Sequence, residues 1–65
     1  MRIPKSDPKA NVFALMGLVR DWLSAHGRLG QWPKVEEEMM SNDYEYACDI
    51  AEQTTEGWLQ VIDDD

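Results

Sequence analysis

The chain has 65 residues, a net charge of −7 and one cysteine, Cys48, which cannot form an internal disulfide. A domain of this size buries only about 60% of the surface that its unfolded chain exposes, and short domains often gain stability by self-association. No apolar run approaches the roughly 20 residues that span a membrane, and the opening "MRIPKSDPK" lacks the apolar stretch of a signal peptide. We therefore expect a single domain over residues 1–65, in a reducing cytoplasm and without a membrane partner.

Charge is divided unevenly along the chain. Residues 1–34 hold all six Lys and Arg residues and two Asp residues, which give +4, whereas residues 35–65 hold eleven carboxylates and no Lys or Arg. A nucleic-acid-binding protein needs a basic surface, so direct binding to nucleic acid is disfavoured. Such asymmetry indicates interaction, and we expect the acidic half to attract a protein with a basic surface.

The first expected elements are an arm and a helix. Residues 1–8 carry two prolines and few apolar side chains, which predicts a flexible N-terminal arm. Asp7 and Asn11 are alternative N-caps for a helix that begins between residues 8 and 11 and ends at residue 26, where Gly27 provides the stop. One face of this helix has the spacing of buried residues: Val12, Leu15, Met16, Val19, Trp22 and Leu23.

A short second helix follows the connection "GRLGQWP", because Pro33 suits the first turn of a helix. Val35 and Met39 give this helix a narrow apolar face. Its opening turns contain three consecutive carboxylates, which favour the positive end of the helix dipole: Glu36, Glu37 and Glu38. The segment "SND" interrupts the helix.

The third helix begins with a capping-box-like pair, Asn42 and Glu45, and ends near residue 56, where threonines and a glycine lower helix propensity. Residues 58–62 are either helical or extended, and residues 63–65 form an acidic tail in water. The apolar face of the third helix contains Tyr44, Ala47, Cys48, Ala51, Thr55, Trp58 and Leu59. The prediction is an all-α fold, a small three-helix domain with two longer helices and one short helix.

Four acids of the third helix recur at intervals of four, three and four residues: Glu45, Asp49, Glu52 and Glu56, called the acid row below. On a helix they occupy a band about 60° wide, roughly 110° from the apolar face. Like charges at this spacing destabilise a helix by a few tenths of a kcal/mol per pair. Two interpretations stay open: the row keeps the protein soluble and is balanced by the basic half, or it contacts a basic cleft of another protein.

The sequence favours no enzyme, no metal site and no cofactor. Catalytic acids need burial and a cleft, which three short helices are unsuited to enclose, and neither a calcium loop nor His and Cys at zinc spacing is present. His26 is expected to be a helix-end residue and Cys48 a small core residue.

Several apolar residues fall outside the predicted core faces, and some of them must lie on the surface or in an interface. Trp32, in the glycine-rich connection, either covers the core or anchors a partner. Tyr44 and Tyr46 are expected to point in opposite directions, with the outward one among carboxylates. The full set is Phe13, Leu18, Leu29, Trp32, Met40, Tyr46, Ile50, Val61 and Ile62.

The segments "NVFALMGLVRDWLSAHG" and "MSNDYEYACDIAEQTTEGW" resemble a group of small phage-encoded proteins that have an Asn-x-Phe-Ala-Leu-Met-Gly opening. The resemblance covers about residues 11–62; "GRLGQWP" is more glycine-rich than that pattern, and the final "DDD" lies outside it. It implies a phage origin and action in a bacterial host cytoplasm, and it carries over no site residues. Many small acidic phage proteins block the basic groove of host nucleic-acid-handling proteins, including restriction and CRISPR effectors.

These observations together predict a non-catalytic inhibitor of the anti-CRISPR or anti-restriction type, which binds a basic host protein. The acid row would supply charged contacts, Glu36 to Glu38 a second acidic edge, and Trp32 and Tyr46 apolar anchors. The alternative is a self-associating helical scaffold protein, a homodimer for example, in which the acids serve only solubility.

Overall fold

A computed structural model describes residues 1–63, which contain three α-helices, two 3₁₀ turns and two short strands. The predicted three-helix domain is confirmed, whereas the strands were not predicted. In chain order the elements are β1 (Arg2–Pro4), η1 (Pro8–Ala10), α1 (Val12–Ala25), η2 (Leu29–Gln31), α2 (Trp32–Ser41), α3 (Tyr44–Thr54) and β2 (Gln60–Ile62).

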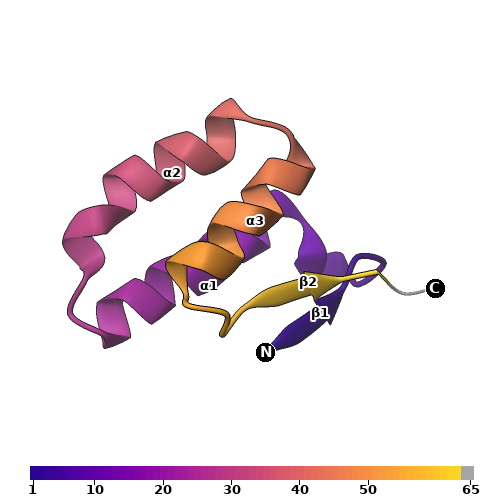
Figure 1. The fold of residues 1–65 in the computed structure, drawn as a ribbon, viewed down its shortest axis with the longest axis horizontal. Coiled ribbons are helices and arrows are strands. Elements are labelled where there is room, and N and C mark those ends of the chain that lie inside the picture. Colours follow the sequence, from indigo (N-terminus) through magenta and orange to yellow (C-terminus); the bar gives the residue numbers. More distant parts are fainter. Residues whose placement is uncertain (64–65) are drawn as a thin grey trace.

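The helix α3 packs against both α1 and α2 and also contacts β2 (Figure 1). The two strands lie side by side at one end of the helices, so the beginning and end of the described chain meet there. The core between these elements is formed by apolar side chains from β1, η1, the three helices and the turn before β2, including Leu15, Val19, Leu23, Met39 and Leu59. Ala47 and Ala51 are fully buried on α3, and their small side chains allow its close contact with the neighbouring helices.

Both candidate caps of the first helix are used, in series. The Asp7 carboxylate accepts a hydrogen bond from the Lys9 N–H at 2.8 Å and caps η1, and Asn11 Oδ1 accepts one from the Ala14 N–H at 2.9 Å and caps α1. The helix therefore begins at the later of the two predicted positions, because Asp7 is used for a separate turn.

The predicted cap of the third helix is wrong by one residue. Asp43 caps α3 by accepting a hydrogen bond from the Tyr46 N–H at 2.9 Å, while Asn42 Nδ2 donates to the Glu38 carbonyl at 2.9 Å and closes α2. A carboxylate accepts strongly at the positive end of a helix, and an amide can also donate to a terminal carbonyl, which a carboxylate cannot. Each side chain is thus matched to the helix end that it caps.

The C-terminal ends of α1 and α3 have the same hydrogen-bond pattern. After α1, the Arg28 N–H donates to the Leu23 carbonyl at 2.7 Å and Gly27 has φ +69°. After α3, the Gly57 N–H donates to the Glu52 carbonyl at 2.8 Å, and the left-handed position is taken by Glu56 with φ 55°. Both ends are Schellman motifs, and only the first has glycine at the residue that favours it.

Thr55 connects the end of α3 to the following turn. Its side chain is buried, and its hydroxyl donates to the Ala51 carbonyl at 2.7 Å and accepts from the Leu59 N–H at 3.0 Å. Trp58, predicted on the buried face of the third helix, is 42% exposed because α3 ends at Thr54. Of residues 58–62, which were expected to be either helical or extended, residues 60–62 are extended in β2, and residues 58–59 form a bend.

The prediction that residues 1–8 form a flexible arm is wrong. Strand β1 pairs in parallel with β2, with Ile3 opposite Val61, and Ile3 is only 3% exposed within the core. Ile3 is a single apolar residue between Arg2 and Pro4, so the segment shows no periodicity, and the pairing partner of Ile3 is remote in sequence. Of the predicted acidic tail, Asp63 is described, and Asp64 and Asp65 lie outside the described residues.

Candidate functional site

The structure divides the acid row. Glu45, Asp49 and Glu52 lie on α3 with exposed side chains, but Glu56 lies beyond the end of the helix in the left-handed conformation. The prediction of four carboxylates on one helical face is therefore wrong for Glu56, because the helix ends before that residue.

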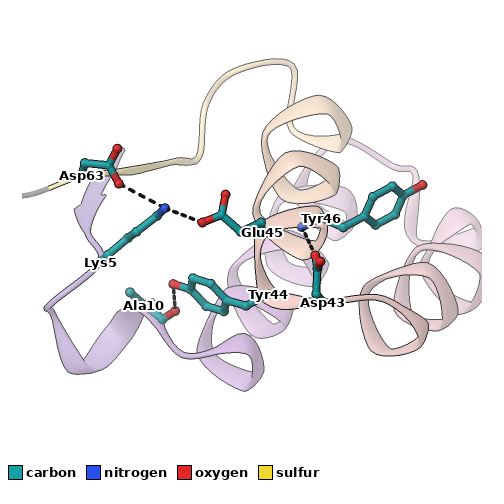
Figure 2. Close-up of polar contacts among 7 residues, drawn as sticks. All are labelled: Lys5, Ala10, Asp43, Tyr44, Glu45, Tyr46 and Asp63. Carbon is teal, nitrogen blue, oxygen red and sulfur yellow. Dashed lines mark hydrogen bonds and ion pairs between the residues drawn. The ribbon is translucent and has the colours of Figure 1, made fainter.

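The N-terminal member of the row is paired with the basic half. The Lys5 ammonium lies 3.0 Å from a Glu45 carboxylate oxygen and 3.1 Å from one of Asp63 (Figure 2). Hydrogen bonding to Glu45 and then to Asp63 raises the pKa of Lys5 above its ordinary value. One cation thus neutralises charge on α3 and at the end of β2 while it holds the turn after β1 in place.

The C-terminal member is also paired. Arg28 Nη1 lies 3.0 Å from Glu56 Oε1, and the guanidinium lies 5.7 Å from the centre of the Trp22 ring, which in turn stacks on His26 at 4.0 Å. Arg28 belongs to the Schellman motif of α1 and Glu56 to that of α3, so this ion pair joins the two helix ends.

The middle of the row remains unpaired. Within residues 1–63, neither Asp49 nor Glu52 forms an ion pair, and both side chains are exposed. The basic half of the chain therefore neutralises the two ends of the row, and the two central carboxylates face solvent.

The three consecutive acids of α2 do not form one edge. Successive residues on a helix point about 100° apart, and Glu36 and Glu37 are exposed while Glu38 is half-buried. Glu38 instead lines a shallow pocket of about 420 Å³ with Lys34, Val35, Gly30 and Gln31.

The two tyrosines point in opposite directions, as predicted (Figure 2). The Tyr44 hydroxyl donates to the Ala10 carbonyl, whereas Tyr46 is exposed. Burial raises the pKa of Tyr44, and burial also raises the pKa of the half-buried Cys48, which keeps its thiol protonated and poorly nucleophilic. Of the two predicted apolar anchors, Tyr46 lies on the surface, and Trp32 is half-buried against the core.

One feature of the surface was not predicted as a site. A pocket of about 450 Å³ lies where the first turn of α1 meets the junction between α2 and α3, and we call it the junction groove. The only sequence signal for it was that Phe13 and Met40 fell outside the predicted core faces. Its lining residues are Asn11, Val12, Phe13, Met39, Met40, Asn42, Asp43 and Tyr44.

Within residues 1–63, no group of three or more His, Cys, Asp or Glu side chains is arranged to hold a metal ion. In the same part of the chain, no helix combines the length and apolar character needed to cross a membrane. No protein-family model, curated protein or solved structure matches the chain.

Proposed function

We propose that this protein is a non-catalytic binding module that places its acidic surface in the basic cleft of a partner protein. The observation that supports this most strongly is the pair Asp49 and Glu52, exposed on α3 and without an ion pair among the described residues. The basic residues of the chain that reach the row are used at its two ends. The central carboxylates are therefore available to an external cation.

Charge and geometry together indicate what kind of cleft would fit. The three row members on α3 extend over about 10 Å of helix axis, or roughly one carboxylate per 5 Å, compared with one phosphate per 3.4 Å in a nucleic-acid strand. The row is thus a less dense line of negative charge than nucleic acid. It suits a cleft whose Lys and Arg residues bind phosphates, and it would compete there by charge rather than by exact phosphate spacing.

The partner we propose is a host nucleic-acid-binding or defence protein in a bacterial cytoplasm, and the proposed role is inhibition of the anti-CRISPR or anti-restriction type. The resemblance to small phage-encoded proteins supports this choice of host and compartment. The net charge of −7 supports the choice of a basic partner, because it speeds association with positive surfaces.

The test is a pull-down from bacterial lysate with the wild type beside a variant in which all four acids of the row are replaced by their amides. We expect the wild type to retain a basic, nucleic-acid-binding protein that the variant loses, and we expect retention to weaken steeply with salt. Retention that is equal for both proteins, or equal at low and high salt, would contradict the proposal.

A second candidate is self-association through apolar surface, which the exposed Phe13 and Met40 favour. In that case the acids would only keep the assembly soluble. Light scattering across micromolar concentrations distinguishes the two functions, since a monomer throughout would exclude the second candidate.

A further inference from the structure

We propose that the junction groove receives an apolar side chain of the partner that is flanked by Lys or Arg residues. This inference rests on the proposed function and adds a second contact to it, because the groove would bind the apolar part of a basic segment while the acid row binds its charges.

The groove is built where three helix ends converge. Phe13 comes from the first turn of α1, Met39 and Met40 from the last turn of α2, and Tyr44 from the first turn of α3. Its volume of about 450 Å³ lies in the range of pockets that enclose small ligands. It is therefore large enough to accept an apolar side chain.

The chemistry of the lining is apolar because its polar side chains are already used. Asn11 Oδ1 accepts from the Ala14 N–H, Asn42 Nδ2 donates to the Glu38 carbonyl, and Asp43 Oδ1 accepts from the Tyr46 N–H. These caps also hold the three helix ends in position. A polar ligand would find few groups to bind here, whereas an apolar side chain would displace water from the floor of the groove.

The two apolar side chains at the groove are unusually exposed. Phe13 is 72% and Met40 is 60% exposed, the largest values among the large apolar residues that the structure describes. Aromatic residues and Met are enriched in protein interfaces, and the flexible Met side chain adapts to different partners. A protein segment lying across the groove would cover both side chains.

Charge near the groove specifies a basic occupant. Asp43 is the one charged residue among the described residues that line it. On α2, Glu36 and Glu37 lie four and three residues before Met40, which places them next to it on the helix surface. A second copy of this chain, with its own net charge of −7, would bring acids against acids.

The experiment uses the full chain labelled with nitrogen-15 and a short synthetic peptide in which one leucine is flanked by two arginines on each side. We expect amide shifts to change at Phe13, Met40 and Tyr44. Replacing the leucine by serine, at unchanged charge, should weaken binding about tenfold. Replacing the arginines by glutamates should abolish binding.

Matched variants of the protein locate the contact. Phe13→Ala and Met40→Ala remove exposed side chains and should reduce leucine-peptide affinity to the level of the serine peptide. Leu29→Ala removes an exposed apolar side chain outside the groove lining and should leave affinity unchanged. Unchanged amide spectra away from the substitution confirm that each variant is folded.

Three outcomes would overturn the inference. The leucine and serine peptides bind equally, the shifts are confined to Asp49 and Glu52, or Phe13→Ala converts a wild-type dimer to a monomer, which assigns the groove to a second copy. In the first two cases the proposed function stands if the lysate partner still depends on the acid row. If the peptide binds in the groove but retention of the lysate partner does not depend on the acid row, the proposed function is contradicted and the groove contact stands.

Discussion

The two ends of α3 differ from its middle in how they use acidic side chains. At the N-terminal end, Asp43 caps the helix and Glu45 pairs with Lys5; at the C-terminal end, Glu56 pairs with Arg28. In the middle, Asp49 and Glu52 face solvent without an ion pair among the described residues. The ends attach the acidic half to the basic half.

This difference separates acids that serve the fold from acids that are available for binding. Surface ion pairs contribute little individually to the free energy of unfolding. The contribution of the two ends of α3 to stability therefore depends mainly on the hydrogen bonds and caps around these ion pairs. Substitutions at the ends should change the free energy of unfolding. Substitutions in the middle should change binding.

The largest expected effect is at the C-terminal end, for Thr55→Val. This change keeps the shape of the side chain but leaves the buried Leu59 N–H without its acceptor, which we expect to lower the free energy of unfolding by about 1–3 kcal/mol. Denaturant unfolding measures it. Thr54→Val is the control, because Thr54 is half-buried and its hydroxyl makes no hydrogen bond within the described residues. Equal effects of the two substitutions would refute the role of the Thr55 hydroxyl.

The next effect is at the N-terminal end, for Tyr44→Phe. Loss of the hydrogen bond to the Ala10 carbonyl should cost about 0.5–1.5 kcal/mol, and Tyr46→Phe, on the exposed tyrosine, should cost nothing measurable. Chemical denaturation of the two variants in parallel measures this difference in the free energy of unfolding. Equal values for the two variants would show that the hydrogen bond of Tyr44 does not stabilise the fold.

The same end should make the fold sensitive to alkaline pH. Burial raises the pKa of Tyr44 above its ordinary 10.0 and that of Cys48 above its ordinary 9.0. The folded state thus holds both protons more tightly than the unfolded chain, so this stabilisation is complete below the ordinary values and is lost as the pH rises through the folded values. We expect the free energy of unfolding to fall with pH above about 9, with a shallower fall in Tyr44→Phe. A flat profile would contradict this.

A smaller effect distinguishes strain from charge at Glu56. Glu56→Gly removes the penalty of a left-handed non-glycine residue, and Glu56→Gln keeps the penalty; both remove the ion pair with Arg28. We expect the glycine variant to be more stable than the glutamine variant by about 1 kcal/mol in thermal or denaturant unfolding. The opposite order would show that the side chain, and not the backbone, controls this helix end.

The sequence predicted the helices and most of their buried faces because these depend on local periodicity. Leu15, Val19, Leu23, Val35 and Met39 are buried as expected. Strand β1 was not predicted because its three residues pair with a strand at the far end of the chain, and nothing in their local sequence pattern indicates that pairing.

The candidate site was predictable only in part. Residue spacing identified the acid row, but a helical projection assumes that the helix continues, and Glu56 lies beyond its end. The assignment of Lys5 to Glu45 and of Arg28 to Glu56 depends on how the helices pack. The junction groove is formed by three helix ends, so its residues share no pattern in the sequence.

Substitutions of Asp49 and Glu52, in the middle of the row, should cause the smallest change in stability and the largest change in partner affinity. The measurement is the affinity of the lysate partner for two double variants. The middle variant carries Asp49→Asn and Glu52→Gln, and the end variant carries Glu45→Gln and Glu56→Gln, so both remove the same number of charges. We expect the middle variant to gain a few tenths of a kcal/mol of stability from relief of repulsion and to lose about tenfold or more in affinity. The end variant should lose stability and keep more of its affinity. Equal affinities for the two variants would contradict the assignment of Asp49 and Glu52 as the binding carboxylates.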